Sequence, residues 1–100
     1  MSINDWRNEI DAIDRELLRL LNMRACMAIK VGALKKEAGL SLNDLEREQD
    51  VLEKVSQANT GPLVDQNIRS LFRRIIRESR RTQQRTLEAK APGVLQEAIR

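Results

Sequence analysis

The sequence predicts an all-α fold, in which chains of three helices, the first of them very long, are intertwined as a helical-bundle homodimer. Only two of the 100 residues are aromatic, and two prolines with four glycines leave few places for turns. Apolar residues also recur at alternating steps of three and four along most of the chain, which is the period of an amphipathic helix. A chain of this length forms at most one domain of ordinary size.

The first predicted helix begins near residues 3–5, with Asn4 or Asp5 as its N-cap. It ends at residues 37–38, where Gly39 offers a C-terminal stop. One face of this helix carries a continuous stripe, apolar apart from one arginine, made of Ile3, Trp6, Ile10, Ile13, Leu17, Leu20, Arg24, Met27, Val31, Leu34 and Ala38.

The length of this helix predicts an obligate homodimer. About 35 residues at ~1.5 Å each give a rod of roughly 50 Å, whereas a compact 100-residue domain has a radius of gyration of only ~13 Å. The rod therefore extends beyond its own domain, and its apolar stripe needs a cover. Because only about 60 residues remain, we expect that cover to include a second copy of the chain.

Two further helices are predicted after the first. The second is capped by Ser41 or Asn43 and runs to about Gln57, and a turn follows at residues 58–62. The third runs from about Leu63 to Glu88, and its inner face is apolar at first and then polar: Val64, Ile68, Leu71, Phe72, Ile75, Ile76, Ser79 and Gln83.

Several kinds of segment and site are excluded by composition. No basic segment followed by an apolar run opens the chain, and no window approaches the ~20 apolar residues of a membrane span. Histidine is absent and Cys26 is the single cysteine, so we expect no metal, no cofactor and no histidine base. Residues 1–90 are expected to form one cytoplasmic domain, and residues 91–100 a tail or linker after the break at Pro92.

Charged and polar residues interrupt the apolar stripe of every predicted helix. Arg24 stands in the first stripe, Glu48 in the second, and Ser79 with Gln83 in the third. Lys35 follows Arg24 by eleven residues, which is close to three turns, so both cations share a face about 16 Å apart along the axis. Together these residues predict a polar pocket in the bundle core, and its cations suit an anionic ligand.

Each of these residues also has a purely structural interpretation. Arg24 could extend to solvent or pair with a carboxylate, and Glu48 could be that carboxylate. Lys35 could be a solvated residue near a helix C-terminus, and Ser79 with Gln83 could be the end of a fading stripe. The pocket hypothesis therefore depends on the occurrence of all of them together.

The chain resembles the all-helical bacterial chorismate mutases, including those fused to prephenate dehydratases. The resemblance covers about residues 3–85 and depends on the order and spacing of several segments. These are WRNEIDAIDRELLRLLNMR with Arg7 and Arg24, KVGALK ending at Lys35, DLERE at residues 44–48, NTGPL, and IIRESRRTQQ with Ser79 and Gln83.

The resemblance implies that the homodimer rearranges the dianion chorismate to prephenate in phenylalanine and tyrosine biosynthesis. It implies that Arg24 and the partner's Arg7 hold the substrate carboxylates with help from Ser79, while Lys35 and Gln83 donate to the ether oxygen. Glu48 accepts from the ring hydroxyl, and Asp44 lies beside it. Geometry agrees for Arg7, since about 25 Å of helix separates it from Arg24 and one small ligand cannot touch both in the same chain.

Three rival functions fit parts of the sequence. An isochorismate pyruvate-lyase would use the same fold, but Asp44, Arg47, Glu48 and Ser79 look like the mutases; Arg47 itself is near the site without an assigned role. A plain coiled-coil scaffold would need no pocket. Nucleic-acid binding would use a predicted outer face on the third helix, but a net charge of +3 without aromatic platforms argues against that function. That outer face consists of Arg69, Arg73, Arg74, Arg77, Arg80, Arg81 and Arg85.

Overall fold

The computed structural model describes residues 1–89, which form three α-helices and no strand. Helix α1 spans Ile3–Glu37, α2 spans Leu45–Ala58 and α3 spans Asp65–Glu88. The prediction of an all-α chain with three helices is therefore confirmed for this range. The predicted tail at residues 91–100 lies outside the described residues. Among helices of the described range, none is long and apolar enough to cross a membrane.

The N-cap of α1 is Ser2, so the prediction of Asn4 or Asp5 is wrong. The Ser2 hydroxyl accepts a hydrogen bond from the backbone N–H of Asp5 at 3.1 Å, and the Asp5 carboxylate accepts one from the Ser2 N–H at 2.9 Å. This reciprocal pair is a capping box, in which the acidic residue stands three positions after the cap. The hydrogen bonds from Ser2 lower the pKa of the Asp5 carboxyl.

The starts of α2 and α3 also differ from the predictions. Asp44 caps α2 by accepting a hydrogen bond from the Arg47 N–H at 3.0 Å, whereas the Ser41 hydroxyl accepts from the Asn43 N–H within the preceding turn. Neither Ser41 nor Asn43 is the cap. Helix α3 begins at Asp65, two residues later than expected, and has no side-chain cap.

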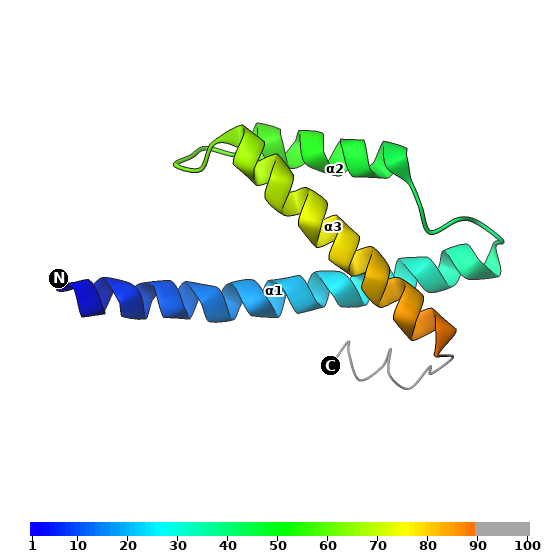
Figure 1. The fold of residues 1–100 in the computed structure, drawn as a ribbon, viewed down its shortest axis with the longest axis horizontal. Coiled ribbons are helices and arrows are strands. Elements are labelled where there is room, and N and C mark those ends of the chain that lie inside the picture. The colour runs from blue at the N-terminus through cyan, green and yellow to red at the C-terminus, as the bar shows by residue number, and fades with distance from the viewer. Residues whose placement is uncertain (90–100) are drawn as a thin grey trace.

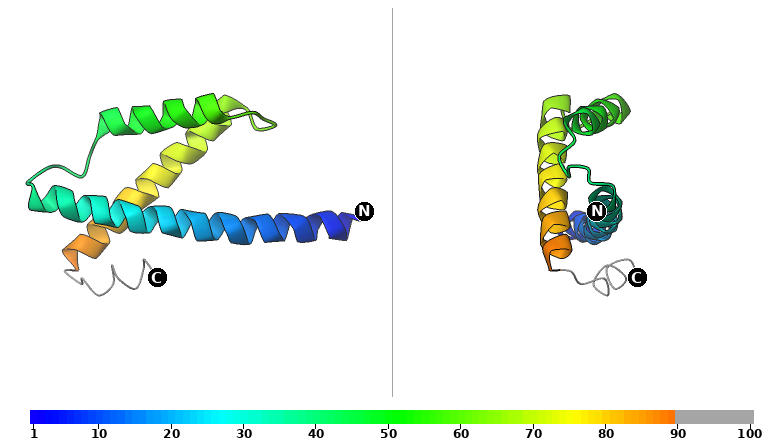
Figure 2. Two further views of the ribbon diagram at one scale, coloured as in Figure 1. Left: turned by 180° about the vertical axis from the view of Figure 1, so that it is seen from behind. Right: turned by 90° about the vertical axis from the view of Figure 1, so that its right-hand side faces the viewer.

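Helix α3 connects the other two helices (Figure 1). It crosses the C-terminal half of α1 with its own C-terminal half, and it packs against α2 near its start. The second view in Figure 2 shows α1 and α2 on the same side of α3. The molecule measures 53 × 30 × 16 Å with a radius of gyration of 16.3 Å, more extended than the ~13 Å of a compact domain of this size.

The buried residues in the contact between α1 and α3 do not belong to the predicted stripe of α1, from which, within residues 1–89, Arg24 alone bonds to α3 through Ser79. The buried residues of α1 are Cys26, Ile29 and Gly32. Gly32 permits close approach, since a Cβ there would lie 3.2 Å from Cδ1 of Leu87 and 3.4 Å from the Gln83 side chain. On the other side of the fold, Leu52 is the buried residue of α2.

The N-terminal arm of α1, residues 3–23, extends away from α2 and α3 (Figure 1). Every residue of this arm is exposed in the single chain. The exposed side chains include Trp6 at 58%, Ile10 at 55% and Leu17 at 53%, all members of the predicted stripe. A contiguous apolar surface of this length is unfavourable in water and is characteristic of a protein–protein interface.

Candidate active site

A cavity of about 260 Å³ lies between the C-terminal half of α1, the start of α2 and the second half of α3. Its lining brings together residues far apart in the sequence, because α3 crosses α1 where the polar positions of both helices face α2. Every predicted site residue apart from Arg7 belongs to this lining, namely Arg24, Lys35, Asp44, Glu48, Ser79 and Gln83.

Arg24 contributes a partly buried guanidinium to the cavity. Its Nη1 donates a hydrogen bond to the Ser79 hydroxyl at 3.0 Å. Burial, and then the nearby charge of Arg47, lower the pKa of Arg24, although an arginine stays protonated at physiological pH. The structure records no ion pair for Arg24 within residues 1–89. The site therefore holds a desolvated cation whose attraction for an anion is strong.

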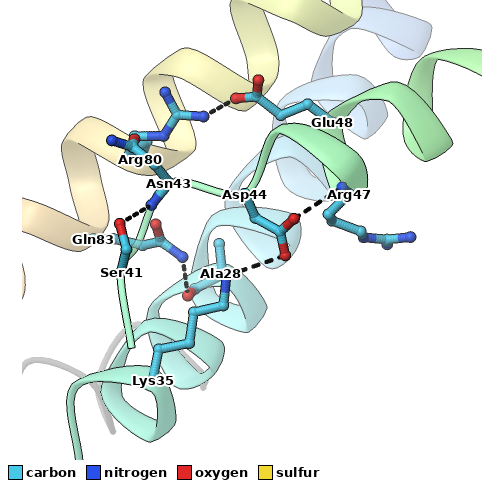
Figure 3. A network of polar contacts seen from close by, with 9 residues as sticks. All are labelled: Ala28, Lys35, Ser41, Asn43, Asp44, Arg47, Glu48, Arg80 and Gln83. Atoms are coloured by element: carbon cyan, nitrogen blue, oxygen red, sulfur yellow. Dashed lines mark hydrogen bonds and ion pairs between the residues drawn. The ribbon is translucent and has the colours of Figure 1, made fainter. Parts of the chain in front are cut away.

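Lys35 lines the same cavity from the last turn of α1. Its Nζ forms an ion pair with the Asp44 carboxylate at 3.5 Å (Figure 3). The backbone N–H of Arg47 and then the charge of Lys35 lower the pKa of Asp44. Asp44 is therefore ionised at neutral pH, where it both caps α2 and orients the lysine. An ammonium has three N–H donors, so Lys35 keeps donors for a ligand.

Ser79 and Gln83 are the buried polar residues of α3, with exposures of 8% and 9%. Gln83 donates from Nε2 to the backbone carbonyl of Ala28 on α1. This bond orients the amide, and the second hydrogen on Nε2 is available to a ligand. Because both residues are buried between helices, they are not the solvated end of a fading stripe.

Glu48 forms its ion pair with Arg80 of α3 and not with Arg24 (Figure 3). The interpretation of Glu48 as the counter-ion of Arg24 is therefore wrong. The placement of Arg80 on an outer face is wrong as well, because Arg80 lines the cavity. Arg69 also points to α2, where it pairs with Glu53 at 3.1 Å. Arg80 follows the buried Ser79 and precedes Gln83 by three positions, a spacing that could have placed it on the inner face.

Arg47 and Arg7 do not direct their guanidinium groups at the other site residues of the single chain. Arg47 lines the cavity, but its guanidinium extends away from the other site residues in Figure 3 and pairs with Asp50 at 2.8 Å. Arg7 lies on the exposed arm, seventeen residues before Arg24, about 25 Å along the helix. The single chain does not bring Arg7 to the cavity.

The charges of the cavity favour an anion that carries hydrogen-bonding groups. Four cationic side chains and two carboxylates line it, which leaves a formal excess of two positive charges. Guanidinium, ammonium, hydroxyl and amide groups supply hydrogen-bond donors from two helices, whereas Glu48 supplies an acceptor. Such a lining can bind a small dianion in one conformation and stabilise negative charge that develops on it.

Comparison with known proteins identifies the family. The pattern that defines "Chorismate mutase type II" matches residues 6–84, a range that includes Arg7 and the whole cavity lining. The chain belongs to the type II chorismate mutase family. The resemblance found in the sequence motifs is confirmed.

Individual members of the family agree with this assignment. The chain is 31% identical over 83 residues to the chorismate mutase of Methanocaldococcus jannaschii, covering 82% of this chain and 84% of that protein. It is 44% identical over 72 residues to the bifunctional chorismate mutase/prephenate dehydratase of Neisseria gonorrhoeae, covering 72% of this chain and 19% of that protein. The chain thus spans only 16% to 22% of the length of the bifunctional chorismate mutase/prephenate dehydratases that it matches.

A solved structure shows the same fold. Chorismate mutase (form II) from Thermus thermophilus superposes with a TM-score of 0.81 at 37% sequence identity. The superposition covers 83% of this chain and 94% of that chain. The arrangement of α1, α2 and α3 is therefore that of a chorismate mutase.

Proposed function

We propose that this chain catalyses the rearrangement of chorismate to prephenate, a step of phenylalanine and tyrosine biosynthesis, in the cytoplasm. The observation that carries the proposal is the cavity itself, in which Arg24, Lys35, Glu48 and Gln83 converge from three helices. Loss of chorismate absorbance with the purified protein tests it. Release of pyruvate from isochorismate, without turnover of chorismate, would instead identify a lyase.

The reaction requires little from the protein beyond shape and charge. In one intramolecular step, the ether carbon–oxygen bond of chorismate breaks as a new carbon–carbon bond forms. No proton, electron or covalent intermediate is exchanged with the protein. Catalysis therefore consists of holding the substrate with its reacting carbons in contact, and of stabilising the negative charge that develops on the ether oxygen.

The residues of the cavity are assigned roles that match these requirements. Arg24, with the Ser79 hydroxyl beside it, binds a substrate carboxylate. Lys35 and the remaining N–H of Gln83 donate to the ether oxygen from opposite helices. Glu48 accepts a hydrogen bond from the ring hydroxyl, and Asp44 holds Lys35 in place through their ion pair.

The second carboxylate is bound by Arg7 of the partner subunit in our proposal, so that residues 1–90 form a homodimer with shared active sites. The exposed apolar stripe of the N-terminal arm supports this, because a second copy would cover it. The position of Arg7 about 25 Å from Arg24 along one rigid helix supports it too.

The homodimer is expected to be obligate, because the apolar arm of a lone chain would be exposed to water. Sedimentation equilibrium at micromolar concentration should give twice the mass of one chain, and dilution should cause loss of helical circular dichroism together with dissociation. A folded monomer at these concentrations would contradict the prediction.

Gln83 is expected to make the activity independent of pH between about 6 and 9, because an amide donates at any pH. A Gln83→Glu variant places a carboxylate against the Ala28 carbonyl and the ether oxygen, and it can donate only when protonated. We expect its kcat to be roughly 100-fold lower at pH 8, rising about tenfold per unit as the pH falls toward the range in which a buried glutamate is protonated.

A Gln84→Glu variant is the matched control for this experiment. Gln84 is the next residue of α3 and is exposed, and it does not line the active-site cavity. Its pH profile should follow that of the wild type. A flat profile for Gln83→Glu would remove Gln83 from the catalytic step.

A further inference from the structure

The ion pair between Arg80 and Glu48 joins α3 to α2 at the wall of the cavity (Figure 3). The two side chains are 26% and 23% exposed, so most of the pair is shielded from water. Within residues 1–89, Arg80 is the one ion-pair partner that the structure records for Glu48. The direction of the Glu48 carboxylate therefore depends on Arg80.

A carboxylate in a site for a dianion creates a physical conflict. An ionised Glu48 is the stronger hydrogen-bond acceptor for the substrate hydroxyl, yet its negative charge repels the substrate carboxylates at short range. Its flexible side chain must also be held in one rotamer, which costs conformational entropy on binding unless it is held beforehand. A guanidinium that pairs with Glu48 at the cavity wall reduces both difficulties, since its positive charge offsets that of the carboxylate and the ion pair restrains the carboxylate.

We propose that Arg80 is a positioning residue of the active site. It holds the Glu48 carboxylate directed at the substrate hydroxyl, and its positive charge offsets the repulsion between that carboxylate and the dianion. The inference deepens the proposed function and rests on it. Because the hydroxyl takes part in neither the bond that breaks nor the bond that forms, Arg80 should contribute to binding of substrate and transition state about equally.

A second ion pair in the same fold provides a matched comparison. Arg69 and Glu53 also join α3 to α2, at 3.1 Å, and the Arg69 side chain is 30% exposed. Arg69 lies eleven residues before Arg80 on α3, about 16 Å along the helix, and neither member of its pair lines the cavity. If Arg80 only tied the two helices together, loss of either arginine would affect activity alike.

The test compares Arg80→Gln with Arg69→Gln in steady-state kinetics on chorismate. For Arg80→Gln we expect KM to rise about tenfold, as for loss of one charged hydrogen bond, with kcat within about threefold of the wild type. Arg80→Lys should recover part of that loss, and Arg69→Gln should leave both constants unchanged. In a Glu48→Gln background, Arg80→Gln should raise KM no further, because its target carboxylate is absent.

Each other outcome overturns the inference. An unchanged KM for Arg80→Gln, or an equal rise for Arg69→Gln, leaves Arg80 with a structural role alone. Independent effects of Arg80→Gln and Glu48→Gln mean that Arg80 contacts the substrate directly. If the wild type does not convert chorismate, the proposed function fails. Urea unfolding of the wild type, Arg80→Gln, Glu48→Gln and the double variant then tests whether Arg80 holds Glu48. Additive shifts in the unfolding midpoint would show that it does not.

Discussion

An Arg24→Ala variant is expected to lose roughly 10³-fold or more in kcat/KM for chorismate while its folding stability changes by no more than about 1 kcal/mol. The two effects separate because Arg24 is desolvated and bonded to a neutral hydroxyl, that of Ser79. Removing Arg24 deletes one hydrogen bond to a neutral acceptor, but it also removes a partly buried charge whose desolvation is unfavourable. Absorbance assays and thermal unfolding of the same preparation measure both quantities.

The matched control is Lys30→Ala, which removes an exposed cation from the same helix. Its activity and melting temperature should both remain close to those of the wild type. If Arg24→Ala kept wild-type activity, the arginine would be a tolerated defect in a coiled coil. A coiled-coil scaffold would then explain the presence of Arg24 better than a chorismate mutase would.

The positions of Arg24 and Lys35 could be predicted because they depend on one helix. Eleven residues make three turns in any α-helix, so the sequence alone places both side chains on one face. The stripe of the N-terminal arm follows from the same local periodicity. The three helices themselves were predictable from composition, period and turn residues for the same reason.

The ion pair of Arg80 with Glu48 could not be predicted, because it depends on how α2 crosses α3. A row of arginines spaced three and four apart predicts one solvated helix face, and the sequence alone does not show which of these arginines lie at the edge of that face. In the fold, Arg69 and Arg80 lie at the boundary toward α2 and pair with its carboxylates. The helix caps were missed for another reason, since several neighbouring Ser, Asn and Asp residues compete for each cap.

Mixing two inactive variants is expected to restore about one quarter of the wild-type activity if the active sites are shared. Suppose that Arg7→Ala and Arg24→Ala chains are unfolded together in urea and refolded at equal concentrations. Half of the dimers are then heterodimers by random assortment. One site in each heterodimer combines an intact Arg24 with the partner's intact Arg7, whereas the other site lacks both.

The control for this mixture replaces Arg7→Ala by Lys35→Ala. Arg24 and Lys35 line the cavity of the same chain, so every site in that heterodimer lacks one of them, and mixing should restore nothing. Recovery in the first mixture alone requires that Arg7 act across the dimer interface. Recovery in neither mixture, with heterodimers verified by mass, would contradict the shared site. Arg7, which is exposed in the single chain, thus provides the sharpest test of whether dimerisation is required for catalysis.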